Sequence, residues 1–133
     1  LRIDSARFDI KLNEKNKFKI FVDLNTSLSY LITVISPYDV QRGINTFTCM
    51  LHESPNFIDF TQVNGAQMYI RTWLDSLQHV SSGNVNPVDN GSGMYEGKIN
   101  FDYAGLWNVH DSIWYNNKLI TERDPPSIVF IVP

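Results

Sequence analysis

The chain has 133 residues, of which 43% are hydrophobic and 19% are charged, and its formal net charge at pH 7 is −3. A chain of this length can bury a substantial core, so we predict a single domain over residues 1–133. The acidic balance leaves no electrostatic footprint for nucleic acid or anionic lipid. Since the sequence has no apolar run long enough to cross a bilayer, we expect no membrane-spanning segment in it. The first residues, "LRIDSARFDI", alternate like a strand, so we expect no signal peptide in them, and a chain that starts at a mature domain boundary would look the same.

Hydrophobic and polar residues alternate along most of the chain, a pattern typical of half-buried strands. In chain order, the pattern predicts strands over 8–12, 18–24, 29–36, 47–51, 57–62, 67–73, 94–103, 106–115 and 126–133. Pro37 ends one of them, Asn64-Gly65 predicts a type I′ hairpin turn between two others, and residues 116–118 predict a further turn. Seven to nine strands with no competing helical window predict an all-β fold, an immunoglobulin-like antiparallel β-sandwich.

Residues 78–93, "QHVSSGNVNPVDNGSG", read as one long polar loop. Long loops in compact domains are often functional, and the alternative is a plain surface crossover between the two sheets.

The sequence lacks the motifs of the common enzyme classes, such as G-x-S-x-G, H-E-x-x-H, C-x-x-C or a glycine-rich phosphate loop. The dipeptides His52-Glu53 and His110-Asp111 place a base beside an acid. Because neighbours on a strand point to opposite faces, neither dipeptide can form a proton relay by itself. We therefore predict a protein that is not an enzyme, with His110-Asp111 as an edge pair on a solvated face.

The soft side chains suggest a metal ion instead. Copper(I) prefers thioether, thiolate and imidazole ligands, and Met50 and His52 lie two residues apart on one strand, roughly 6–7 Å between their Cα atoms. In the alternative interpretation, Met50 fills a packing gap and His52 is exposed at the strand end. The single cysteine, Cys49, excludes an intrachain disulfide, and its apolar strand neighbours Phe47 and Leu51 predict that it is buried and inert.

Over roughly positions 43–120 the chain resembles YtkA-like domains, which are extracytoplasmic immunoglobulin-like β-sandwiches of bacterial envelope proteins associated with copper handling and cation efflux. The resemblance rests on "GINTF", "AQMYIRTW", "GNVNPV", "GMYEGKINF" and "GLW". It implies a location outside the cytoplasm, in the periplasm or anchored to the envelope, and an envelope protein as partner.

In the family pattern, a tryptophan at the loop entry is followed by two methionines and a histidine, and a third methionine lies two residues before the glycine of Gly-x-Trp. Here Trp73 and His79 match this pattern, whereas the methionine positions hold Leu74, Leu77 and Tyr103. The resemblance thus implies a soft-metal site whose thioethers have been replaced.

Copper binding by His79 would then need a substitute ligand, which could be Met94, Met68 or the pair Met50 and His52. Met94 is the best candidate because it lies at the far end of the same loop. The candidate metal ligands are therefore His79 with Met94, or Met50 with His52. In the alternative interpretation, His79 anchors the loop by hydrogen-bonding backbone groups of "SSGNVN".

These observations predict a non-enzymatic extracytoplasmic binding or accessory module of YtkA-like type, linked to copper or cation handling. The alternative is a protein–protein interaction or adhesion module that uses loop 76–93 and exposed aromatics such as Tyr38, Trp114 or Tyr115. A carbohydrate-binding sandwich, the third possibility, requires aromatics gathered on one face, and the sequence has no strong pattern of that kind.

Overall fold

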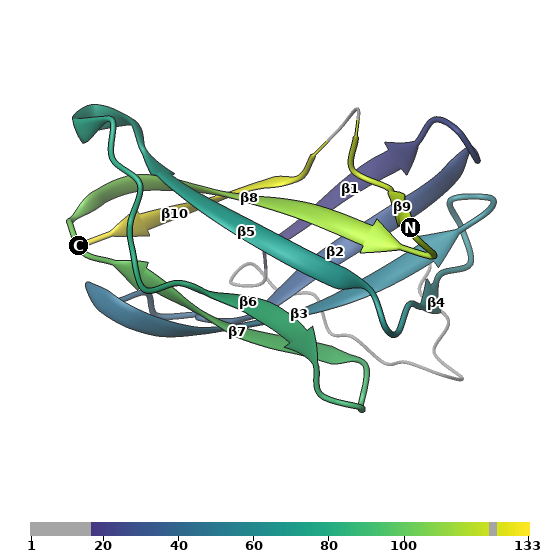
Figure 1. Cartoon of the computed structure of the whole chain (residues 1–133), viewed down its shortest axis with the longest axis horizontal. Coiled ribbons are helices and arrows are strands. Elements are labelled where there is room, and N and C mark those ends of the chain that lie inside the picture. Colours follow the sequence, from purple (N-terminus) through teal and green to yellow (C-terminus); the bar gives the residue numbers. More distant parts are fainter. Residues whose placement is uncertain (1–16, 123–124) are drawn as a thin grey trace.

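The computed structural model of this chain describes residues 17–122 and 125–133, which form two antiparallel β-sheets packed face to face (Figure 1). The first sheet has the order β1 (Lys17–Asp23), β2 (Leu28–Ser36), β3 (Gly43–Ser54), β7 (Met94–Phe101) and β6 (Val85–Asp89), with β4 (Thr61–Gln62) also paired to β3. The second has the order β10 (Ser127–Val132), β8 (Gly105–Tyr115) and β5 (Gln67–Leu74), with β9 (Lys118–Leu119) also paired to β8.

The predicted all-β sandwich is confirmed, with ten described strands, two of which are only two residues long. The predicted strand over 8–12 lies outside the described residues. Among the described residues the only helical element is the three-residue turn η1 (Asp75–Leu77), so no described helix could cross a membrane.

The core lies between the two sheets. Aromatic rings meet at one end of it, where Phe101 of the first sheet lies 5.5 Å, between ring centroids, from both Trp107 and Phe130 of the second. All three side chains are fully buried. Burial of a large apolar side chain contributes about 1.5–3 kcal/mol, so the core side chains, these three among them, hold the sheets together.

The turn at Asn64-Gly65 does not join a hairpin, because β4 pairs with β3 in the first sheet whereas β5 belongs to the second. Gly65 has a positive φ of 75°, but Asn64 does not, so the turn is not the predicted type I′, and it carries the chain from one sheet to the other. The hydroxyl of Tyr95 fixes this crossover, since it donates to the carbonyl of Val63 at 2.8 Å and accepts from the amide of Ala66 at 3.1 Å.

Residues 78–93 are not one long loop, because they contain strand β6, which pairs with β7. Pro87 lies at a register shift between Val85 and Val88, where no ladder hydrogen bond is needed from its missing amide. The bulge and the proline break the period-two pattern, which explains why the sequence concealed this strand.

Other predicted boundaries agree with the structure. Strand β2 ends at Ser36, directly before Pro37. Asn116 and Asn117 adopt the positive φ values of 53° and 59° that the β8–β9 turn requires. The predicted strand over 57–62 shrinks to β4, because the side chain of Asn56 accepts hydrogen bonds from the amides of Ile58 and Asp59 and closes a turn there.

Candidate functional site

The chain reverses sharply between the end of β5 and His79. The amide of Leu74 donates to the carbonyl of His79 at 2.8 Å, and the amide of His79 donates back to the carbonyl of Leu74 at 3.1 Å. Gln78 supplies the left-handed turn, with φ of 47° and ψ of 54°. The backbone alone therefore places the imidazole of His79 at the end of the sandwich, beside the corner between β7 and β8.

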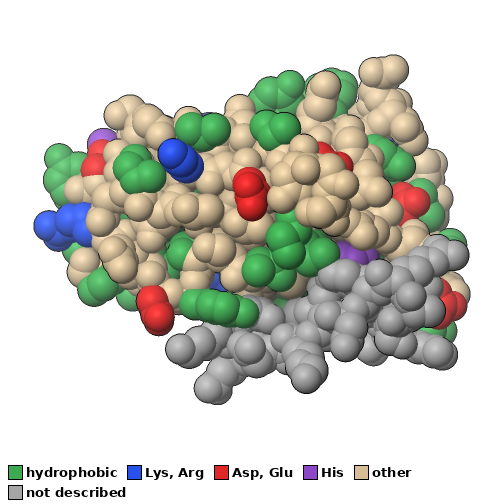
Figure 2. Space-filling model, turned by 90° about the horizontal axis from the view of Figure 1, so that it is seen from below, with side chains coloured by type: hydrophobic (Ala, Val, Ile, Leu, Met, Phe, Trp, Pro, Cys, Tyr) green, Lys and Arg blue, Asp and Glu red, His purple; other side chains and the backbone are tan. Residues whose placement is uncertain are grey.

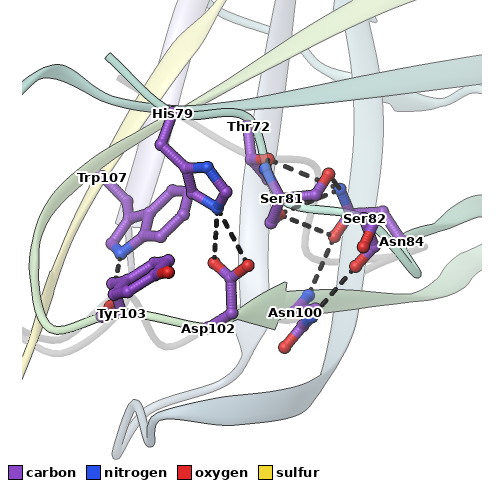
Figure 3. A network of polar contacts seen from close by, with 9 residues as sticks. All are labelled: Thr72, His79, Ser81, Ser82, Asn84, Asn100, Asp102, Tyr103 and Trp107. Carbon is purple, nitrogen blue, oxygen red and sulfur yellow. Dashed lines mark hydrogen bonds and ion pairs between the residues drawn. The ribbon is translucent and has the colours of Figure 1, made fainter. Parts of the chain in front are cut away.

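The side chain of His79 is held by an acid and two aromatic rings (Figure 3). Its Nε2 lies 3.0 and 2.9 Å from the two carboxylate oxygens of Asp102. Tyr103 and Trp107 pack against the imidazole edge-on, with centroids 5.0 and 5.9 Å away. His79 is therefore a loop anchor, as in the alternative interpretation, but its partner is a carboxylate on the neighbouring corner and not the loop backbone.

A second group of contacts ties the following loop to both sheets. The hydroxyls of Thr72 and Ser81 lie 2.6 Å apart, and the Nδ2 of Asn84 donates to the carbonyl of Ser81 at 3.2 Å. The side-chain oxygen of Asn84 accepts from the amide of Asn100 at 2.8 Å, and the Nδ2 of Asn100 donates to the carbonyl of Ser82 at 2.9 Å (Figure 3). Hydrogen bonds therefore connect the loop to β5 of one sheet and to β7 of the other.

The other positions named by the resemblance differ in their surroundings. Leu74 is fully buried, and a Cβ at Gly105 would lie only 2.9 Å from its Cδ1. Leu77 and Tyr103 are 56% and 48% exposed. The structure brings Leu74 and Tyr103 together around His79, and neither side chain can supply the thioether that a soft metal would need.

The predicted pairing of His79 with Met94 is wrong. Met94 is the first residue of β7, whereas Asp102, which holds His79, directly follows its last residue. Eight residues of extended chain separate the two by about 25 Å. The loop returns as β6, antiparallel to β7, so its two ends lie at opposite ends of that strand.

Met94 lies instead beside the other predicted pair. In the register of β3 and β7, Met50 is the direct cross-strand partner of Met94. His52 follows two residues later on the same face of β3, opposite Gln62 of β4. Directly paired residues of antiparallel strands have Cα atoms about 4.5–5.5 Å apart and side chains on one face. The three soft side chains Met50, Met94 and His52 therefore share one patch of the first sheet, at the junction of β7 and β4.

His52 is not exposed at a strand end, as the alternative interpretation expected, because it is fully buried, and Met50 is only 6% exposed. Burial lowers the pKa of His52 from its usual 6.5 to about 4. The imidazole is therefore neutral at physiological pH, which is the form that binds metals.

On the opposite face of β3, the buried Cys49 meets the core, as predicted. Its thiol donates to the Sδ of Met68 across the two sheets at 3.7 Å. Burial, and to a smaller degree the nearby Asp111, raises the pKa of the Cys49 thiol well above its usual value.

The prediction of a solvated edge pair at His110-Asp111 is wrong, because β8 is the central strand of its sheet and Asp111 faces the core, fully buried. Burial raises the pKa of Asp111 well above its usual range and outweighs the opposite effect of the Tyr69 backbone. The Tyr69 amide favours the ionised form, but neither carboxylate oxygen makes a hydrogen bond of good geometry with any residue that the structure describes.

The outer face of the second sheet has a hollow of about 430 Å³ that sequence reasoning missed. Its lining consists of Arg71 and Trp73 from β5, His110 and Ser112 from β8, and Pro125. Arg71 and His110 are direct cross-strand partners. The alternation in "QMYIRTW" and "WNVHDSIW" places these residues on the outer face, but only the pairing of β5 with β8 brings them together.

Surface charge is scattered on the face that Figure 2 shows, where acidic and basic side chains lie singly among hydrophobic and polar ones. Within residues 17–122 and 125–133, no three His, Cys, Asp or Glu side chains form a group that could hold a metal ion. No protein-family model, curated protein or solved structure matches this chain. The resemblance to YtkA-like domains therefore stays a hypothesis.

Proposed function

We propose that this chain is a non-enzymatic extracytoplasmic binding module that holds a soft monovalent cation, Cu(I), through Met50, Met94 and His52. The proposal rests on one observation, the register that pairs Met50 with Met94 and places His52 on the same face. The extracytoplasmic location and an envelope protein as partner are supported by the sequence resemblance alone.

The chemistry of the three side chains suits this ion. Two thioethers and one imidazole are soft or borderline ligands. Cu(I) prefers such ligands, whereas harder ions such as Mg²⁺ or Ca²⁺ prefer oxygen atoms. Because the low pKa of His52, about 4, keeps its imidazole neutral, binding would not have to displace a proton at neutral pH. A hydrogen bond from the Nε2 of Gln62 to the carbonyl of Ser92, 3.3 Å long, holds β4 against the turn that precedes Met94.

An anaerobic competition titration of Cu(I) against a chromogenic chelator tests this proposal. We expect one equivalent to bind to the wild-type protein, and Met94→Leu to weaken binding about tenfold or more, because leucine keeps the volume but has no sulfur. Met94 is half-buried, so this substitution should leave the fold intact. Met68→Leu removes a thioether from the core and His79→Ala removes the imidazole at the end of the sandwich, and neither should change the affinity.

Two results would contradict the proposal. One is the absence of Cu(I) binding by the wild-type protein at micromolar concentration. The other is binding that Met94→Leu leaves unchanged while His79→Ala abolishes it, because that pattern would place the ion at the end of the sandwich, beside Asp102.

A further inference from the structure

The outer face of the second sheet carries no carboxylate on its three main strands. The outward positions, which alternate with the buried ones, are Gln67, Tyr69, Arg71 and Trp73 on β5, Leu106, Asn108, His110, Ser112 and Trp114 on β8, and Ser127, Val129 and Ile131 on β10. The whole chain has 14 acidic and 11 basic residues, and none of the acidic ones occupies these outward positions. The one permanent charge on these positions is the guanidinium of Arg71.

Arg71 is exposed, and no described carboxylate lies within ion-pairing distance of it. It borders the hollow together with Trp73, His110 and Ser112. A guanidinium presents a planar fork of donors that matches a carboxylate in bidentate fashion. An anionic group of a ligand would therefore fit beside Arg71. The ring nitrogens of His110 and the hydroxyl of Ser112, next to Arg71, could make further hydrogen bonds to that ligand.

Aromatic side chains flank this charge. Trp73 is half-buried, and its Nε1 donates to the carboxylate of Asp75 at 3.4 Å, which orients the indole at one end of the hollow. Tyr69 and Trp114, 49% and 41% exposed, lie toward the other end of β5. Four residues of strand separate Tyr69 from Trp73, about 14 Å. Flat apolar surfaces at both ends of a polar stretch suit an extended ligand with several rings.

A peptide that adds a strand to β5 does not fit this face as well. At the free edge of β5, the amide of Ile70 already donates to the side chain of Asn86 at 2.9 Å, and the amide of Leu74 donates to the carbonyl of His79 at 2.8 Å. Strand addition depends on free backbone groups at a sheet edge. Recognition on this face must therefore come from side chains, which suits sugar rings with their apolar faces and many hydroxyls.

We propose that the hollow on the outer face of β5 and β8 binds an acidic glycan, a chain of sugars that carry carboxylates. One carboxylate pairs with the guanidinium of Arg71, the ring next to it stacks on Trp73, and its hydroxyls bond to His110 and Ser112. This site is separate from the patch of Met50, Met94 and His52, which lies on the other sheet.

Isothermal titration with a trimer of galacturonic acid, with a neutral maltotriose as the comparison, tests the proposal. We expect saturable binding of the acidic trimer, weaker at high salt, and no comparable binding of the neutral one. Arg71→Gln should weaken binding about tenfold or more, through the loss of a charge-assisted pair. Trp73→Leu should weaken it as well, whereas Lys98→Gln, on the outer face of the opposite sheet, should have no effect.

Equal binding of the two trimers would overturn the proposal, as would the absence of binding at millimolar concentration. Binding of the acidic trimer that Arg71→Gln leaves unchanged would also overturn it. Since Arg71 is exposed at an outward position of β5, thermal unfolding of the variant should match the wild type, and this match would show that a loss of binding does not come from misfolding.

Discussion

Asp111 is the most unusual single residue of the molecule. It lies between Val109 and Ile113 on the core-facing side of β8, where apolar side chains belong, and its oxygens have no described hydrogen-bond partner. Burial of an ionised carboxylate without a partner is costly, and this cost raises the pKa of the Asp111 carboxyl well above its usual value. Asp111 therefore lowers the stability of the fold at neutral pH.

We predict that Asp111→Asn raises the free energy of unfolding at pH 7 by about 1–3 kcal/mol. The folded-state pKa of Asp111 is raised above its unfolded value of 3.8, so the folded protein binds more protons than the unfolded chain between the two values. Stability should be greatest below the unfolded pKa and fall as the pH rises toward the folded one. Urea unfolding at a series of pH values would show this slope in the wild type and its loss in Asp111→Asn.

Asp23 is a suitable control because its environment acts in the opposite direction. Burial alone would raise its pKa, but hydrogen bonds from the Asn25 amide, the Thr26 hydroxyl and Lys118 together hold the pKa below 3.8. Asp23→Asn should therefore reduce stability at pH 7 and keep the pH slope that Asp111 causes. If Asp111→Asn destabilised the protein at neutral pH, the carboxylate would have to be ionised and paired in the folded state.

At the scale of elements, residues 75–84 depend on their side chains for a fixed position. One end is held by the hydrogen bond between His79 and the Asp102 carboxylate, and the other by the contacts of Ser81 and Asn84 with Thr72. The apolar side chains Leu77 and Val80 of this segment are exposed, so hydrophobic burial contributes little there. Polar contacts thus decide how ordered the segment is.

We predict that Asp102→Ala lowers the hydrogen-exchange protection of the Leu74 and His79 amides, because the imidazole loses its anchor. The global free energy of unfolding should fall by only about 1 kcal/mol, the usual net contribution of one hydrogen bond. Hydrogen exchange measured by mass spectrometry should show faster exchange in residues 75–84 of the variant and unchanged exchange in β3. Glu96→Ala removes an exposed carboxylate from β7 and should change neither; equal loss of protection in both variants would refute the anchoring role.

At the scale of the whole molecule, the contact between Cys49 and Met68 reports on the integrity of the sandwich, since the two sulfurs come from different sheets. The thiol is fully buried and its pKa is raised, so it cannot react while the sheets are together.

We predict that Cys49 reacts with a disulfide reagent only when the sheets separate. The labelling rate should rise with urea in parallel with global unfolding measured by tryptophan fluorescence, and Asp111→Asn, which stabilises the fold, should slow it. Rapid labelling in the absence of urea would mean that the sandwich opens locally around β3.

The sequence predicted where most strands lie, but it did not predict which strands pair with one another. The alternation around Phe47, Cys49 and Leu51 identified a core-facing strand, and Asn116-Asn117 identified a turn, because both signals are local. Asn64-Gly65 predicted a type I′ hairpin turn, but only Gly65 has positive φ, and a turn sequence does not say whether the next strand stays in the same sheet. Strand β6 escaped notice because Pro87 and a bulge interrupt its alternation.

The sequence by itself therefore determined the all-β class, most strand positions and the burial of Cys49. Only the tertiary structure decided which residues meet: it separated His79 from Met94, paired Met94 with Met50, turned Asp111 into the core and brought Arg71 beside His110. The physical reason is that the period-two pattern gives the two faces of each strand, whereas the partner and the register of a strand depend on contacts between residues far apart in the chain.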